Sequence, residues 1–223
     1  MTTPIFAATA AVSVLASTAA MAEAPAWPDT YVARLEVLAL LQSLNANLLS
    51  HESATQTLTD WCSAHQLSTA GKITAQRVKD VDKPADAAVL AALKVTPGTP
   101  VRYRRVRLAC GDRVLSEADN WYLPGRLTPE MNRLLDETDT PFGVVVKSLA
   151  YQRHTLSAAL LFHPLPDGWD LVPPAAAAAP GHLAIPHALL QHEAVLTTAG
   201  APFSLVIETY TDKILPDRAA GRR

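Results

Sequence analysis

Glu208 is the residue whose type and surroundings most suggest chemistry. It is the one charged residue in a segment, residues 203–210, that is otherwise mostly apolar, and in a strand it shares a face with Val206 and Tyr210. A carboxylate in such a segment either lies at an exposed edge or is buried for a purpose, because burying an unpaired charge is costly. Burial would raise the pKa of Glu208 and suit it to proton transfer near neutral pH.

An arginine-rich segment, residues 101–110, could bind the anionic part of a substrate. The guanidinium group is the preferred planar partner of carboxylates, because it can donate two parallel hydrogen bonds. Strand side chains alternate between faces, so Arg105 and Arg107 share one face while Arg102 and Arg104 share the other. The alternative interpretation is a solvated face with scattered arginines, and the segment alone does not decide between the two.

Metal and cofactor chemistry have little support in the sequence. His182, His187 and His192 follow one another at intervals of five residues, which places them on no common helix face, and Pro186 interrupts them. The sequence contains no Walker, G-x-S-x-G, H-E-x-x-H or dinucleotide-binding pattern. We therefore expect neither a metal nor an organic cofactor.

The composition excludes several classes of protein. The 223 residues include 19 Lys+Arg and 21 Asp+Glu, so the chain lacks the basic excess of a dedicated nucleic-acid binder. Charged residues make up 18% and apolar residues 49%, which indicates a folded chain. Cys62 and Cys110 are too few for a disulfide-rich scaffold; they either pair in an oxidising compartment or remain two buried thiols.

The first 22 residues are typical of a secretory signal peptide. They contain no charged residue and end in Ala20-Met21-Ala22, a small-x-small pattern followed by Glu23, although Lys or Arg is missing at their start. This interpretation predicts a periplasmic or secreted protein. The alternative is translation from Met21, which predicts a cytoplasmic protein. No other stretch is long and apolar enough to span a membrane.

Helix signals come first along the chain. Residues 31–49, with Asp29 or Thr30 as the cap, have a leucine-rich face, and residues 54–65 follow a capping box formed by Ser53 and Gln56. We expect a short strand over residues 73–78 and then a helix from Pro84 to about residue 94.

Strand signals dominate the second half and predict a single α+β domain. The expected strands cover residues 101–110, 114–123, 151–162, 192–198 and 203–210, with short helices over residues 128–136 and 144–149. Residues 163–181 are expected to form an irregular loop. This order predicts an antiparallel sheet flanked by helices, with the domain over residues 23–216 and a polar tail over residues 217–223.

Three segments form a recognisable pattern: the helix start at residues 53–58 (S-A-T-Q-T-L), the hairpin from Tyr103 through Pro124 to Thr140-Pro141-Phe142-Gly143, and the closing hairpin from Leu196 to Glu208. Together these segments resemble the chorismate pyruvate-lyase family of ubiquinone biosynthesis, whose fold is shared by effector-binding domains of GntR-type regulators. The resemblance extends from about residue 48 to residue 215 and implies a chorismate lyase-like fold.

The resemblance implies a role for three residues. Arg105 matches the arginine that binds the ring carboxylate, the backbone N–H of Phe142 holds the same carboxylate, and Glu208 lies near the ring hydroxyl. Arg105 and Glu208 would then act in the elimination of pyruvate from chorismate to give 4-hydroxybenzoate, without a cofactor. Asp119-Asn120 replaces the family's G-R pair, so a second positive charge is missing from that strand.

Three functional hypotheses remain open. They differ in whether the protein is an enzyme. The first is a chorismate lyase-like protein that binds a small aromatic or cyclic carboxylate and eliminates pyruvate from chorismate. The second is a non-catalytic, exported binding module of the same fold. The third is a partner-binding protein that has lost the site. The expected partners are chorismate or a small aromatic carboxylate, with no nucleic acid and no membrane span, and the resemblance favours a monomer.

Overall fold

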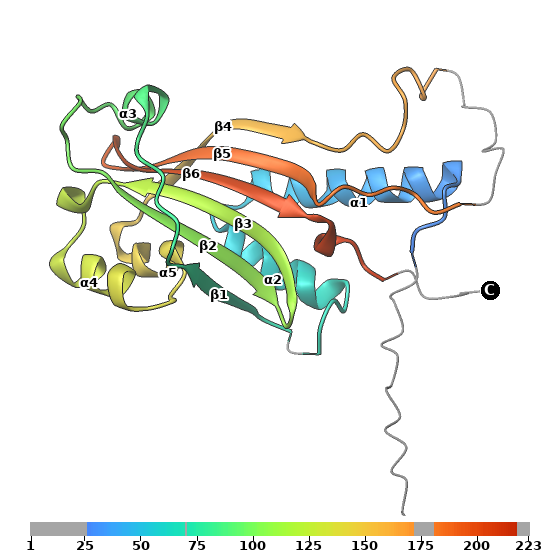
Figure 1. Ribbon diagram of the computed structural model, residues 1–223, viewed down its shortest axis with the longest axis horizontal. Helices are drawn as coiled ribbons and strands as arrows, with labels where there is room; N and C mark the ends of the chain where they lie inside the picture. The colour runs from blue at the N-terminus through green and yellow to red at the C-terminus, as the bar shows by residue number, and fades with distance from the viewer. Residues whose placement is uncertain (1–25, 70, 172–180, 218–223) are drawn as a thin grey trace, which may run out of the picture.

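The computed structural model describes residues 26–69, 71–171 and 181–217 (Figure 1). The expected leader, residues 1–22, lies outside the described residues. So do residues 172–180 of the expected irregular loop and residues 218–223 of the expected polar tail. Residues 163–171, the described part of that loop, contain neither helix nor strand.

A six-stranded antiparallel sheet forms the framework, in the order β1-β2-β3-β6-β5-β4. Two hairpins, β2–β3 and β5–β6, make up its centre, and they are joined by the pairing of β3 with β6. β1 and β4 form the edges. The strands are β1 (Ile73–Val78), β2 (Arg102–Cys110), β3 (Arg113–Tyr122), β4 (Gln152–Leu160), β5 (Ala188–Thr198) and β6 (Ala201–Thr211).

Helices cover both faces of the sheet unequally (Figure 1). α1 (Tyr31–Ser50) and α2 (Ala54–Ala64) pack their leucines against residues of β2 and β6, such as Leu108 and Tyr210. α4 (Pro129–Glu137) and α5 (Phe142–Val145) form a second cluster with Tyr122 and Phe203. α3 (Ala87–Leu93) packs on the other face, against Trp121 and Leu205. Single 3-10 turns lie at Pro124–Arg126, Lys147–Leu149 and Asp212–Ile214.

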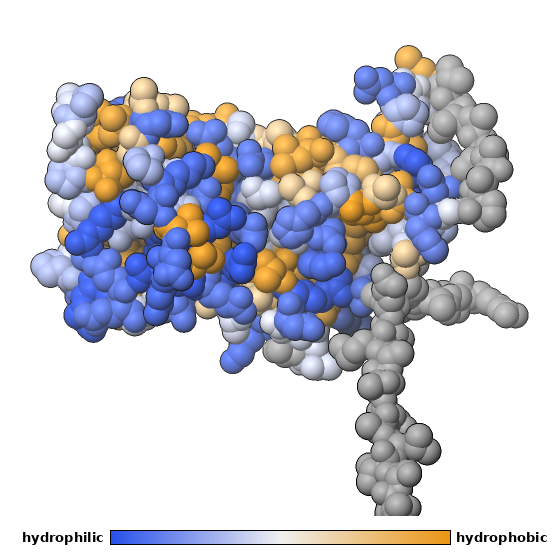
Figure 2. Space-filling model, in the orientation of Figure 1, coloured by the Kyte–Doolittle hydropathy of each residue, from blue (hydrophilic) through white to orange (hydrophobic). Residues whose placement is uncertain are grey.

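The outer face of the sheet is the face turned away from α1 and α2. Over β2 and β3 it is largely hydrophilic, and Figure 2 shows mostly polar residues there with scattered apolar ones. Arg105, Arg107, Glu117 and Asp119 belong to this face and form ion pairs with one another. The apolar core therefore lies mainly on the α1–α2 side. The α+β class, with its antiparallel sheet flanked by helices, is confirmed.

Side-chain caps explain where the main helices begin. Thr30, Ser53 and Thr128 each accept a hydrogen bond from the backbone N–H three residues later, which satisfies a donor that the first turn leaves free. The predicted starts of α1, α2 and α4 are confirmed to within one residue. The predicted start of α3 at Pro84 is wrong, because Asp86 is the capping residue and the helix begins at Ala87.

Three further elements begin more than one residue earlier than predicted: β6, which starts at Ala201 rather than Phe203, and the two described next. β5 starts at Ala188 rather than His192, since Leu189 and Leu190 are fully buried and extend the strand toward its start. The short helix expected over residues 144–149 begins earlier, at Phe142, and is followed by a separate 3-10 turn. Phe142 therefore lies in the first turn of a helix and not in the turn before it.

A disulfide joins the helical layer to the sheet. Cys62 of α2 and Cys110 at the end of β2 are both fully buried and bonded to each other. The neighbouring Trp61 donates its indole N–H to the carbonyl of Ile214 at 2.9 Å. The pairing of the two cysteines, which the sequence left open, fixes one end of α2 against β2.

A buried histidine connects α1 to the centre of the sheet. His192 of β5 is fully buried, with its Nε2 2.8 Å from Oδ1 of Asn45 and its ring edge-on to Tyr210 at 5.7 Å. Its Nδ1 has no hydrogen-bond partner among the described residues. Burial lowers the pKa of His192, and this effect outweighs the nearby Glu208 carboxylate, which acts in the opposite direction. The folded protein therefore disfavours the charged imidazolium.

We expect removal of the disulfide to destabilise the protein. The double variant Cys62→Ala/Cys110→Ala should lose about 2–4 kcal/mol in free energy of unfolding, because the bond joins residues 48 positions apart and restricts the unfolded chain. Urea unfolding under non-reducing conditions measures the loss. Addition of dithiothreitol should bring the wild type close to the variant, and an unchanged midpoint in both experiments would contradict the expectation.

The acid sensitivity of the fold should depend on His192. Stability that requires a neutral imidazole is complete above the unfolded-state pKa of about 6.5, and it is lost as the pH falls through the lower folded-state pKa. We expect the free energy of unfolding to decrease between about pH 7.5 and about pH 5, and to decrease less in His192→Gln. Urea titrations at both pH values provide the comparison, and equal losses in the two proteins would rule out His192 as a source.

Candidate functional site

A pocket, partly open to solvent, lies on the face of the sheet that α2 and α5 cover. Its floor comes from β2, β3 and β6, and β4 and the first turn of α2 complete its walls. Both charged and aromatic side chains line it. Those used below are Glu52, Arg104, Asn120, Phe142, Tyr151, Arg153, Leu196, Val206 and Glu208.

Strand register places the floor residues side by side. Arg104 of β2 lies opposite Asn120 of β3, which lies opposite Val206 of β6. Two residues further along β6, Glu208 lies between Ala118 and His192. Because alternate residues of a strand point to the same side, this register directs Arg104, Asn120 and Glu208 into one pocket.

Arg104 is a buried cation without a salt bridge in the part of the chain that the structure describes. Arg104 is 2% exposed. Its Nη2 donates hydrogen bonds to the backbone carbonyls of Thr138 at 3.1 Å and Thr140 at 3.0 Å. Nε and Nη1 are buried and have no described partner. Burial lowers the pKa of Arg104, and nearby Arg77 lowers it further. The guanidinium is thus desolvated while part of its donor capacity is unused.

An ion pair supplies the other buried charges of the pocket. Nη2 of Arg153 donates to Oε2 of Glu208 at 2.6 Å, and each side chain is 8% exposed. The hydroxyl of Tyr210 donates to the same oxygen at 3.3 Å. Burial opposes the charge on Arg153, but Glu208 together with Tyr210 and Tyr151 outweighs this effect, so the pKa of Arg153 is raised. Oε1 of Glu208 has no hydrogen bond among the described residues, and it remains available to a ligand.

Aromatic side chains form the apolar wall of the pocket. The ring of Phe142 stacks on Phe203 with 6.3 Å between centroids and lies 5.5 Å from the ring of Tyr122. Gly143 permits a close approach from Tyr151, because a Cβ on this glycine would lie 3.1 Å from the tyrosine hydroxyl. Phe142 begins α5, so its backbone N–H has no acceptor within that helix.

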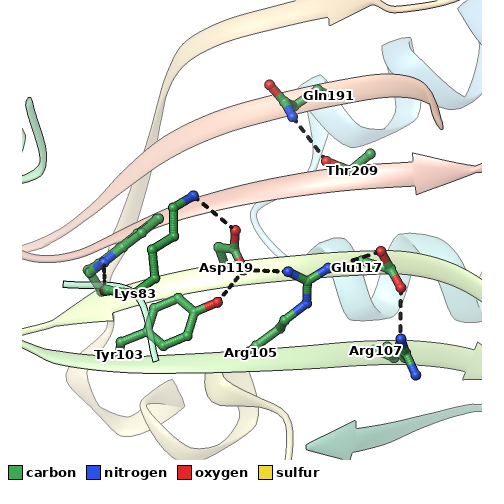
Figure 3. Close-up of polar contacts among 9 residues, drawn as sticks. Lys83, Tyr103, Arg105, Arg107, Glu117, Asp119, Gln191 and Thr209 are labelled. Carbon is green, nitrogen blue, oxygen red and sulfur yellow. Dashed lines mark hydrogen bonds and ion pairs between the residues drawn. The ribbon is translucent and has the colours of Figure 1, made fainter. Parts of the chain in front are cut away.

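Arg105, which was expected beside Glu208 and Phe142, lies on the opposite face of the sheet, because it follows Arg104 directly in β2. Figure 3 shows it beside Glu117 and Asp119. Its guanidinium is 3.2 Å from a carboxylate oxygen of Glu117 and 3.6 Å from one of Asp119. Tyr103 also donates to Asp119, at 2.6 Å. The structure therefore brings Glu208 and Phe142 together but separates Arg105 from them, because strand alternation places Arg104 in the pocket.

The sequence contained a signal for Arg104 but none for Arg153. Arg104 shares its strand face with Val106, Leu108 and Cys110, and a face this apolar must be the covered one. Arg153 is a single arginine in a mostly polar strand, and only the fold shows that it reaches the pocket. Asp119, whose charge could have repelled an anionic ligand, lies on the outer face with Arg105.

Neither a metal site nor a membrane span is found in the described residues. Residues 26–69, 71–171 and 181–217 contain no group of three or more His, Cys, Asp or Glu side chains placed to hold a metal ion. The helices in these ranges are all too short or too polar to cross a membrane.

Comparison with solved structures finds domains of transcriptional regulators with a similar fold. PhnF from Mycobacterium smegmatis is 16% identical, covers 75% of this chain and 67% of its own, and gives a TM-score of 0.45. The C-terminal domain of the histidine utilization repressor from Pseudomonas syringae is 14% identical, with coverage of 68% and 99% and a TM-score of 0.40. Ligand-binding domains of the GntR family are among these neighbours. TM-scores this low say nothing about ligand or activity.

Comparison of sequences identifies a close relative. No protein-family model matches the chain. It is, however, 53% identical over 191 residues to the uncharacterized protein y4mC of Sinorhizobium fredii, and the match covers 85% of this chain and 81% of that protein. The chain therefore belongs to the same family as y4mC.

Proposed function

We propose that the pocket binds a small organic carboxylate, which accepts hydrogen bonds from Arg104. The unpaired donors of Arg104, a residue only 2% exposed, are the observation that carries this proposal. Buried polar groups in native proteins are almost always hydrogen-bonded, and a buried cation needs a compensating charge. A carboxylate provides both the acceptors and the charge, and its bonds to arginine are strong because both partners are ionised.

The remaining walls favour an aromatic or cyclic ligand. Phe142, Tyr151, Leu196 and Val206 supply an apolar surface of the kind that lines small-molecule sites. Oε1 of Glu208 provides a hydrogen-bond acceptor away from Arg104 along the floor. A ring with a carboxylate at one end and a hydroxyl or amine at the other fits these features.

Elimination of pyruvate from chorismate is the second candidate function. It is favoured because an arginine, Phe142 and Glu208 line one pocket, as the resemblance to chorismate pyruvate-lyase implies, with Arg104 in the place expected for Arg105. In this reaction the ether C–O bond breaks, the ring loses a proton and becomes aromatic, and enolpyruvate leaves. The protein would mainly bind and orient the substrate.

Neighbouring arginines provide a matched test of binding. We expect Arg104→Gln to weaken 4-hydroxybenzoate binding about 10- to 100-fold, because a hydrogen bond between charged groups contributes about 1.5–3 kcal/mol. Arg105→Gln changes the same residue type one position away, on the other face, and should leave Kd within about twofold. Isothermal titration calorimetry measures both. Weaker binding in Arg105→Gln alone would exclude the proposed site.

The same proteins decide between binding and catalysis. Incubation with chorismate, followed by assays for pyruvate and 4-hydroxybenzoate, detects lyase turnover. Formation of both products by the wild type, and its loss in Arg104→Gln and Glu208→Gln, would establish the second candidate. Binding of 4-hydroxybenzoate without product formation would establish a non-catalytic binding protein.

We also propose that the protein is exported to an oxidising compartment. Support comes from the Cys62–Cys110 disulfide, since such bonds persist mainly outside the cytoplasm, and from the signal-like residues 1–22. N-terminal sequencing of the native protein should begin at Glu23. A native N-terminus at Met21 would contradict export. The monomeric state implied by the resemblance stays a prediction.

A further inference from the structure

The buried side chains of the pocket carry two positive charges and one negative charge, so one further negative charge would balance them. Arg153 and Glu208 compensate each other across 2.6 Å, and both side chains are 8% exposed. Arg104 has no such partner among the described residues. Glu52 also lines the pocket, but it is exposed, so water and salt screen its charge. One carboxylate on a ligand therefore balances the buried part of the site.

Arg153, the second arginine of the pocket, is not available to bind a second anionic group of a ligand. The chorismate pyruvate-lyase family has a second positive charge on the strand that corresponds to β3, and this chain has the uncharged Asn120 in its place. The side-chain oxygen of Asn120 accepts a hydrogen bond from the hydroxyl of Ser204 at 2.6 Å. Arg153 brings a positive charge into the pocket from β4 instead. That charge is already paired with Glu208, and a ligand carboxylate would have to displace Glu208 to use it.

A second ligand carboxylate would also meet a like charge. Oε1 of Glu208 is the oxygen left without a described hydrogen bond, because Arg153 and Tyr210 both donate to Oε2. An ionised oxygen in this position repels a carboxylate, and the repulsion is strong where water is largely excluded. A hydroxyl or amine has the opposite effect, since it donates a hydrogen bond to Oε1.

We propose that the Arg153–Glu208 ion pair selects monocarboxylates with a neutral hydrogen-bond donor at the opposite end, and excludes dianions. Arg153 is then a specificity-determining residue, because it neutralises Glu208 and holds its carboxylate in place. This inference rests on the proposed function, since it assigns the second end of the same ligand. Chorismate carries two carboxylates and belongs to the disfavoured class, which favours binding of a product-like ligand over lyase activity.

Benzoate and two of its para-substituted derivatives test the selectivity of the full chain. 4-Hydroxybenzoate carries a neutral donor, benzoate carries no second group, and terephthalate carries a second carboxylate. Calorimetry on the wild type should find 4-hydroxybenzoate tightest, benzoate about 10-fold weaker through the lost hydrogen bond, and terephthalate weakest. Equal or tighter binding of terephthalate by the wild type would overturn the proposal.

Glu208→Gln is the decisive variant, because it preserves the shape of the side chain and frees the charge of Arg153. Terephthalate should gain at least about 10-fold in affinity and overtake 4-hydroxybenzoate, since the pocket would then hold two uncompensated arginines. The double variant Arg153→Gln/Glu208→Gln removes both charges of the ion pair, leaves Arg104 as the buried charge without a described partner, as in the wild type, and should again reject terephthalate. An unchanged ratio of the two affinities in Glu208→Gln would also overturn the proposal.

Failure of the proposed function has a different signature. If Arg104→Gln leaves the affinities of all three benzoates unchanged, or if none of them binds the wild type, the carboxylate site itself is wrong, and the selectivity proposal falls with it. If Arg104→Gln weakens all three benzoates while Glu208→Gln changes no ratio, only the role of the ion pair is refuted. Thermal unfolding of each variant confirms that the compared proteins are folded.

Discussion

The pairing of β3 with β6 is the contact on which both the sheet and the pocket depend. It joins two hairpins that lie some eighty residues apart in the sequence, and it aligns Asn120 with Val206 and Ala118 with Glu208. Since Arg104 is held opposite Asn120 within the first hairpin, this one register fixes the distance between the arginine and the glutamate. A slip by one residue would turn either of them to the outer face.

The ion pairs on the two faces of the sheet differ in their exposure to water. On the outer face, Arg105, Glu117 and Asp119 keep partial contact with water, where ion pairs contribute little to stability. On the inner face, Arg153 and Glu208 are almost completely buried, and there a missing partner would be costly. Neighbouring arginines of one strand therefore have unlike surroundings, with Arg105 in a solvated network and Arg104 buried without a salt bridge among the described residues.

Local signals predicted most of the framework. Capping residues marked the starts of three helices, and turn residues between apolar segments marked the hairpins, because these features depend on residues close together in the sequence. The start of β5 was missed because burial of Leu189 is decided by distant parts of the chain. The site was predicted only in part. Glu208 and Phe142 line the pocket, whereas Arg105 lies on the outer face of the sheet. Arg104 lies in the pocket, and its apolar neighbours in the strand indicated that face. The approach of Arg153 to the pocket depends on the order of the strands.

The position of Arg153 has a consequence for how such a pocket diversifies. β4 is the last strand of the described sheet, it has a single described neighbour in β5, and most of its side chains are exposed. Substitutions there disturb few packing contacts, whereas Arg104 and Glu208 lie in central strands where most changes would harm folding. If Arg153 sets ligand preference as proposed, substitutions in β4 would change that preference while the central hairpins stay the same, so that stability and specificity depend on different parts of one sheet.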